Sequence, residues 1–212
     1  NARLVFIDES GFIMAPQVRR TWAPRGVTPV LYQRTRSHRK VSVIAALTLP
    51  PRYQRVGLYF SLHTDADITA HRALLFLRRL TRQIQKPLLM CRTSSTPPRS
   101  IRNPLAFAPS ERAVEYLPPY APELNPVEHL WGYLKGNPLA NWAPKEISEL
   151  SLATRYHAVR LRGSGKLLRS FLYATPLFHA LNKTLLIQWS IKDTFQSAGH
   201  IYGHLLLITK IL

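Results

Sequence analysis

The chain has 212 residues, 46% of them hydrophobic, which suits one globular domain with its own core. It carries 29 Lys and Arg against 11 Asp and Glu, and the net charge of +18 makes nucleic acid the first partner to consider, with a merely basic surface as the alternative. Cys91 is the single cysteine, which excludes an internal disulfide and a cysteine-based zinc site and suits a reducing cytoplasm. No apolar run approaches the roughly 18 residues of a membrane span, and no signal peptide is recognisable, so we expect no membrane partner.

The N-terminal half predicts three strands of one sheet. Residues 4–7 form an apolar run that ends in the turn formers Asp8-Glu9-Ser10-Gly11, which predicts a buried strand with acids at its carboxyl end. Residues 41–49 and 55–63 are rich in β-branched and aromatic side chains and are separated by Pro50-Pro51-Arg52, which predicts a hairpin-like pair. The first strand begins almost at Asn1, so we expect a further segment upstream.

Four helices and two further strands are expected after residue 64. Asp65-Ala66-Asp67 predicts the N-cap of a helix with apolar residues at helical spacing from Ile68 to Leu80. The remaining expected elements are strands at 87–90 and 113–117, helices at 126–135, 144–162 and 166–173, and a patternless stretch at 92–109. This order of elements predicts an α/β fold, in which helices cover a mixed sheet.

Two acids stand where a metal site would be expected. Asp8 follows the first strand, and ligands in open α/β sheets bind outside the carboxyl ends of the strands. Glu128 opens a helix, and convergent carboxylates are the oxygen ligands that Mg²⁺ prefers. Two purely structural interpretations compete with a metal site: Asp8 can be an ordinary turn acid, and Asn125-Pro126-Val127-Glu128 matches a capping-box-like helix start.

Three blocks of sequence resemble the mariner-related transposases of bacterial insertion sequences, which are DDE-type endonucleases. The blocks are residues 4–12 (LVFIDESGF), 20–26 (RTWAPRG) and, above all, 116–131 (YLPPYAPELNPVEHLW). The resemblance implies a ribonuclease-H-like catalytic domain over residues 1–178, followed by a tail of unknown structure at 179–212. It also implies that Asp8 and Glu128 are the first and third catalytic carboxylates and bind Mg²⁺ or Mn²⁺.

The second catalytic Asp of that family is missing. In its place stand Arg92 and Thr93, and no Asp or Glu occurs between Asp67 and Glu111. Residues 92–109 resemble a piece read in the wrong frame, because an Arg codon ending in G followed by a Thr codon, which begins AC, contains the Asp codon GAC. We therefore expect that strand transfer is lost.

The resemblance implies DNA transposition in a bacterial cytoplasm, close to the nucleoid: metal-dependent cleavage at the ends of an element, then strand transfer into target DNA. The alternative is a pseudogene-like, catalytically inactive remnant that binds double-stranded DNA without sequence preference. Whether this copy is an enzyme stays open, as does a homodimer. A general RNA-binding module lacks any aromatic-stacking or Gly-loop signature.

A basic stretch between the first two strands suits phosphate contacts, although it can also be a solvated face. Its candidate nucleic-acid-binding residues are Arg19, Arg20, Arg25, Arg34, Arg36, Arg39 and Lys40. Trp131 lies on an apolar helical stripe and is expected to pack in the core. The histidines show no metal-ligand spacing and are expected to be ordinary surface or core residues.

Overall fold

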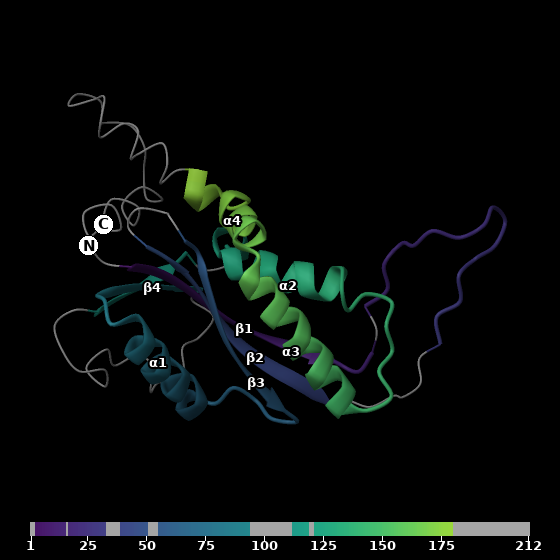
Figure 1. Ribbon diagram of the computed structural model, residues 1–212, viewed down its shortest axis with the longest axis horizontal. Coiled ribbons are helices and arrows are strands. Elements are labelled where there is room, and N and C mark those ends of the chain that lie inside the picture. Colours follow the sequence, from purple (N-terminus) through teal and green to yellow (C-terminus); the bar gives the residue numbers. More distant parts are fainter. Residues whose placement is uncertain are drawn as a thin grey trace.

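One five-stranded sheet organises the protein (Figure 1). The structure is a computed structural model that describes residues 3–15, 17–32, 39–50, 55–93, 112–118 and 121–179. The strands are β1 (Arg3–Ile13), β2 (Lys40–Leu49), β3 (Gly57–Thr64), β4 (Leu88–Thr93) and β5 (Arg112–Leu117), in the order β3-β2-β1-β4-β5. The first three are antiparallel neighbours, whereas β4 pairs in parallel with β1 and β5 in parallel with β4. This confirms the predicted mixed sheet.

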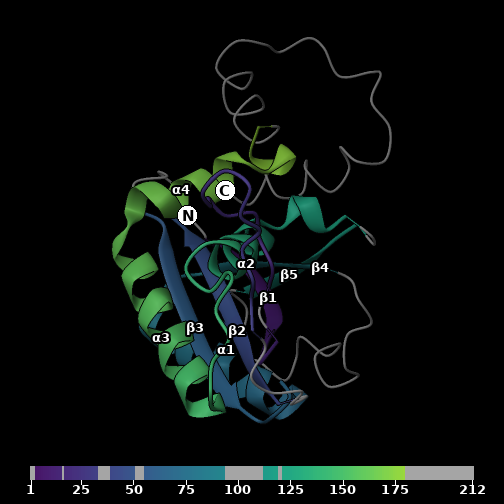
Figure 2. The same cartoon turned by 90° about the vertical axis from the view of Figure 1, so that its right-hand side faces the viewer.

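Helices cover both faces of the sheet (Figure 2). They are α1 (Ala70–Ile84), α2 (Pro126–Gly136), α3 (Ile147–Gly163) and α4 (Gly165–Tyr173), with a short 3-10 turn, η2 (Pro122–Leu124), before α2. Side chains alternate between the two faces of a strand. Leu4 and Phe6 of β1 therefore belong to the core under α2, α3 and α4, while Val5 and Ile7 belong to the core under α1.

β1 does not end at Ile7, as the sequence predicted, but continues to Ile13. β2 pairs with it from Leu4 to Ile13, and this long antiparallel ladder holds the expected turn formers in an extended strand. What stops after Ile7 is the parallel pairing with β4, whose last partners are Ile7 and Arg92. Asp8 is therefore a strand residue rather than a turn acid, and it lies where β1 loses its partner on one side.

The start of α1 and the end of β4 also differ from the prediction. The cap of α1 is Thr69, whose side chain accepts a hydrogen bond from the Arg72 amide, and not the Asp65–Asp67 segment. β4 extends to Thr93, so the first two residues of the supposedly patternless stretch are paired with neighbouring strands. The rest of that stretch, and the tail beyond His179, lie outside the described residues, and the domain boundary at 178 stays a prediction. No helix in the described part combines the length and apolar character needed to cross a membrane.

The packing of α1 yields a prediction about stability. Leu80 is 1% exposed and packs against the sheet, whereas Leu75 of the same helix is 38% exposed. We expect Leu80→Ala to lower the free energy of unfolding by about 2–5 kcal/mol, because a cavity is left, and Leu75→Ala to lower it by less than about 1 kcal/mol. Urea unfolding measures both values, and equal losses would show that α1 does not pack through this face.

Candidate active site

One face of α2 lies against one face of β1. Glu128, Trp131 and Lys135 have the spacing of residues on one face of a helix. Asp8 and Ser10 are two residues apart in the strand and so lie on the same face of the sheet. Trp131 Nε1 donates a hydrogen bond to Asp8 Oδ2 at 2.9 Å, and Lys135 Nζ donates to Ser10 Oγ at 2.7 Å. The helix therefore presents a carboxylate, an indole and an ammonium group to successive polar residues of the central strand.

The ring of Phe12 completes this contact. It meets Trp131 nearly edge-on, with ring centroids 6.0 Å apart, and its centroid lies 5.3 Å from Lys135 Nζ. Phe12 is buried, and the Lys135 ammonium group makes a cation–π contact with its ring while it donates to Ser10.

Asn125 determines where α2 begins. Its side chain is buried and makes two hydrogen bonds: Oδ1 accepts from the Val127 amide at 3.1 Å, and Nδ2 donates to the Ile7 carbonyl at 3.3 Å. Pro126 occupies the first helical position, where its missing N–H costs nothing. One side chain thus caps the helix and ties it to the backbone beside Asp8.

Glu128 does not complete a capping box. In a capping box its carboxylate would accept a hydrogen bond from the Asn125 amide. That amide instead donates to the Pro122 carbonyl at 2.9 Å. The carboxylate of Glu128 is therefore available to the site, and the capping-box interpretation of this residue is wrong.

The structure brings Asp8 and Glu128 together. Burial, and next the negative charge of Glu128, raise the pKa of Asp8 to about 7, while the hydrogen bond from Trp131 lowers it. Burial lowers the pKa of the Lys135 ammonium, and the two carboxylates act in the opposite direction. Two like charges that are held together in a partly buried place are a pair that a cation would stabilise.

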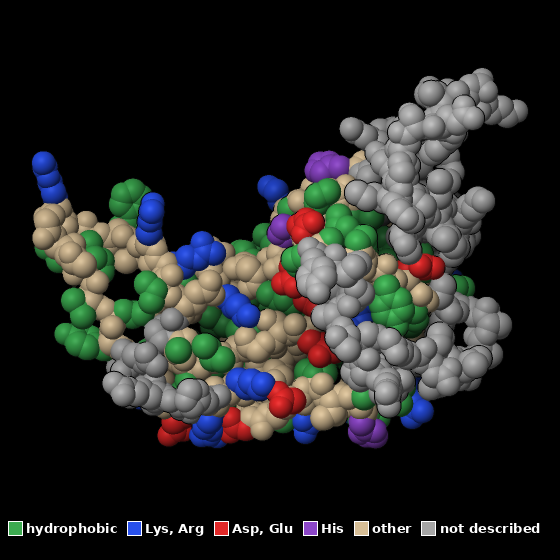
Figure 3. All heavy atoms as spheres, turned by 180° about the vertical axis from the view of Figure 1, so that it is seen from behind, with side chains coloured by type: hydrophobic (Ala, Val, Ile, Leu, Met, Phe, Trp, Pro, Cys, Tyr) green, Lys and Arg blue, Asp and Glu red, His purple; other side chains and the backbone are tan. Residues whose placement is uncertain are grey.

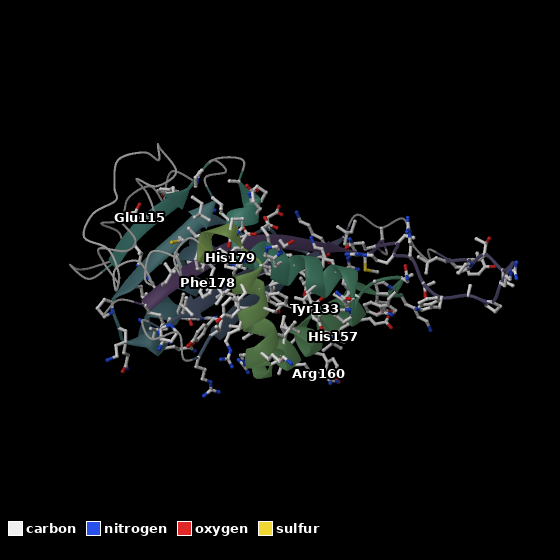
Figure 4. The ribbon with its side chains drawn as sticks, turned by 90° about the horizontal axis from the view of Figure 1, so that it is seen from above. Glu115, Tyr133, His157, Arg160, Phe178 and His179 are labelled. Atoms are coloured by element: carbon white, nitrogen blue, oxygen red, sulfur yellow. The ribbon has the colours of Figure 1, made fainter. Side chains whose placement is uncertain are left out.

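The described residues supply two of the three carboxylates of the expected metal site. They contain no group of three or more His, Cys, Asp or Glu side chains that could hold a metal ion. Glu115 lies on the edge strand β5, in register with Cys91 and separated from β1 by β4 (Figure 4). Asp8 and Glu128 therefore fit one divalent ion, and the described residues do not fit a pair of ions.

Arg92 faces away from this site. Its Nη2 lies 3.5 Å from Glu9 Oε1. Each of the two residues follows a residue of the core under α1 by two positions and so lies on the same face of the sheet as that core. The parallel pairing of β1 with β4 ends at Ile7 and Arg92, and the same register continued by one residue would bring position 93 level with Asp8. Residues level on neighbouring parallel strands share a face. By this register, a carboxylate next to Asp8 is expected from position 93, and not from position 92.

Residues 17–32 form an exposed arm that extends away from the sheet (Figure 1) and carries Arg19, Arg20 and Arg25. Basic side chains, drawn in blue, are visible along it in Figure 3. The arm also exposes apolar side chains, including Trp22, which is 99% exposed. Its base is held by a bridge between Gln17 and Ala140 in the loop that follows α2.

The other basic candidates are not on the described arm. Arg39 and Lys40 form exposed ion pairs with Asp65 and Asp67, respectively, close to the junction of β3 and α1. Arg34 and Arg36 lie outside the described residues. Of the five basic candidates that the structure describes, three therefore lie on the arm and two lie at this junction.

Sequence reasoning missed several residues of the site. Trp131 was expected only in the core, although it also donates to Asp8, and Lys135 was not singled out. Both share a helical face with Glu128, and this spacing was the signal that could have found them. Asn141, which binds both backbone groups of Arg19, gave no comparable signal.

A family model described as DDE superfamily endonuclease matches residues 3–151. No curated protein matches the sequence. Among solved structures, the Mos1 mariner paired end complex with Mn has a TM-score of 0.59 at 15% identity, over 91% of this chain and 56% of that chain. The Mos1 Strand Transfer Complex has a TM-score of 0.55 at 18% identity, over 81% and 53%.

A third similar structure, the mariner Mos1 paired end complex with Mg, has a TM-score of 0.54 at 19% identity, over 80% of this chain and 53% of that chain. This chain thus spans little more than half the length of the solved proteins, and at such identities the likeness shows the fold alone. That fold is the ribonuclease-H-like fold of the transposases, as predicted. Because the family model covers most of it, the chain belongs to the DDE superfamily endonucleases.

Proposed function

We propose that this chain is the catalytic-fold domain of a transposase that binds double-stranded DNA and one divalent ion, Mg²⁺ or Mn²⁺, but does not cleave the DNA. The observation that supports it is the Asp8–Glu128 pair without a third carboxylate among the described residues. An active transposase, which would cleave the ends of an element and transfer them to target DNA, needs another ligand. Glu111, which lies outside the described residues, is the acid nearest in sequence to positions 92 and 93 and could supply this ligand.

Each described residue of the site has a definite task in this proposal. Asp8 and Glu128 would hold the ion, whose chemistry is to neutralise charge and polarise a phosphate oxygen. Trp131 orients the Asp8 carboxylate, and Asn125 keeps the start of α2 against β1. Without a carboxylate at position 93, the site lacks charge and oxygen ligands that a second ion would need.

The charge of the chain supports DNA as the partner. A net charge of +18 favours sequence-independent contacts with phosphates, for which dissociation constants are typically about 10⁻⁴–10⁻⁶ M at physiological salt. The similar Mos1 structures are paired-end and strand-transfer complexes, which supports extending the proposal to a homodimer on two DNA ends. Such a protein would act in the bacterial cytoplasm.

A combined binding and cleavage assay tests this function. We expect the chain to retard a DNA duplex with little sequence preference and with an affinity that falls steeply as salt rises. In Mg²⁺ and in Mn²⁺ it should leave supercoiled DNA intact, and so should the Glu128→Gln variant. Metal-dependent cleavage by the unaltered chain that Glu128→Gln abolishes would overturn the proposal and point to a third ligand.

The register of β4 predicts that, of two neighbouring substitutions, only one increases the stabilisation of the protein by Mn²⁺. Thr93→Asp adds a carboxylate level with Asp8 and should increase the rise in melting temperature that Mn²⁺ causes. Arg92→Asp removes the ion pair with Glu9 and adds a like charge there, so it should lower the melting temperature without increasing the effect of Mn²⁺. Neither variant should regain cleavage, because metal ligands need a rigid supporting shell. A larger Mn²⁺ effect in Arg92→Asp would refute this register argument.

The raised pKa of Asp8 predicts how stability depends on pH. The folded chain binds this proton more tightly than the unfolded chain does, so the Asp8 carboxyl costs stability as pH rises from about 4 to about 7. We expect Asp8→Asn to stabilise the protein by a few kcal/mol at pH 8 and by little at pH 4. Asp67→Asn is the control with the opposite sign, because the hydrogen bond from Lys40 lowers the pKa of Asp67. Unfolding curves of both variants at the two pH values test this.

A further inference from the structure

We propose that the exposed face of α3 binds the same face of a second copy of this chain, with the two helices antiparallel. The inference goes beyond the proposed function, because this contact needs neither DNA nor a metal ion. Helix α3 packs beside β3, at one edge of the sheet (Figure 2), and β2 separates β3 from the strand that carries Asp8. A partner bound to α3 would therefore lie away from the Asp8–Glu128 pair.

Helix α3 has apolar side chains on two opposite sides. The side that packs in the core consists of Ile147, Leu150, Thr154, Ala158 and Leu161. On the other side, Leu152, Tyr156 and Val159 have the four- and three-residue spacing of one helical stripe. They are 68%, 54% and 43% exposed, respectively. We call these three residues the outer stripe. Exposed apolar side chains that are grouped in this way mark an interaction surface, whereas single ones are ordinary.

The charges beside the outer stripe favour a second copy as the partner. Glu149 and Arg160 are eleven residues apart, which is close to three turns at 3.6 residues per turn, so both lie along one side of the stripe. The acid stands near the N-terminal end of the helix and the base near its C-terminal end. If two such helices pair antiparallel about a two-fold axis, the acid of each copy faces the base of the other. A self-complementary surface of this kind is what a two-fold dimer requires.

Contacts within α3 hold both charged groups in place. Arg160 Nη1 donates a hydrogen bond to the Tyr156 hydroxyl at 2.9 Å, and Arg160 Cζ lies 5.6 Å from the centroid of the Tyr156 ring. Glu149 Oε2 accepts from the Lys145 amide at 2.6 Å, and its second carboxylate oxygen can accept from a further donor. Side chains that are ordered before binding lose less entropy when a partner arrives.

The contact should be weak and reversible. The outer stripe is small compared with the roughly 20–30 residues that each partner contributes to a standard interface. Its other side carries Arg155 and Arg162, and α3 has no acid after Glu149 to balance them. The net charge of +18 adds repulsion between two copies. We therefore expect an equilibrium between monomer and dimer rather than a permanent dimer.

DNA is the alternative partner of α3, because the helix is basic toward its C-terminal end. A phosphate backbone would bind the arginines, but it gives no role to the apolar outer stripe, and the carboxylate of Glu149 would repel it. A second copy accounts for the stripe, the acid and the base together.

Sedimentation velocity without DNA or divalent ions, over a wide range of protein concentrations, tests the contact. A salt concentration of about 0.15 M gives a Debye length of about 8 Å, which damps repulsion over longer distances. Leu152→Arg places a charge in the outer stripe. The matched control is Leu75→Arg, because Leu75 is exposed on α1, which covers the other face of the sheet. Melting temperatures verify that each variant keeps its fold.

Charge reversal tests the antiparallel arrangement. Within one copy, Glu149 and Arg160 are about 16 Å apart along the helix axis at 1.5 Å per residue, so they cannot contact each other. Glu149→Arg and Arg160→Glu should each raise the dissociation constant of the dimer about threefold or more, because like charges then face each other between copies. The double variant should restore the dissociation constant, and such a recovery can only report a contact between copies.

We expect the unaltered chain and Leu75→Arg to shift toward dimer as concentration rises, and Leu152→Arg to raise the dissociation constant about tenfold or more. If the unaltered chain is monomeric at every concentration, or if Leu152→Arg associates as Leu75→Arg does, the assignment of α3 is wrong. A double variant that does not recover would refute the antiparallel pairing. A monomeric chain whose affinity for a DNA duplex falls in Arg160→Glu, but not in the α1 control Arg78→Glu, would make α3 a DNA contact instead. The proposed function stands in each case, because binding and cleavage of DNA are measured separately.

Discussion

The buried side chain of Asn125 is the contact on which the site depends. It joins segments 118 residues apart by donating to the Ile7 carbonyl while it accepts from the first turn of α2. A buried amide left without partners would cost about 1–3 kcal/mol, so these bonds strongly favour one position of the helix start. With that start in place, the helical repeat turns Glu128, Trp131 and Lys135 toward β1. The geometry of the site thus follows from one capping residue.

The same arrangement explains the electrostatics of the site. Docking α2 brings a carboxylate against Asp8 in a partly buried place, which raises the pKa of Asp8 to about 7. The indole of Trp131 partly compensates, and the ammonium of Lys135 stands close by without forming a salt bridge. On the neighbouring strand β4, Arg92 belongs to the opposite face and pairs with Glu9. The side chain of Arg92 therefore adds no charge to the face of the sheet that holds Asp8.

The sequence predicted the parts of this structure that depend on local patterns. The apolar run of β2 and the Asn-Pro start of α2 could be inferred from periodicity and capping, whereas the joint role of Asp8 and Glu128 was implied by the resemblance to the transposases. The length of β1 could not, because pairing with β2 overrides the turn preference of Asp8 to Gly11. The inclusion of Arg92 in β4 also depends on two neighbouring strands and leaves no local signal. Lys135 was missed because a lysine near a helix end is ordinary until its strand partner is known.

The central claim is that Asp8 and Glu128 form a cation site of reduced capacity. Counting bound Mn²⁺ by electron paramagnetic resonance, in the unaltered chain and in Glu128→Gln, tests it most directly. The account predicts one bound ion per chain in the former and none in the latter. Two ions per chain, or one that persists without the Glu128 carboxylate, would contradict it.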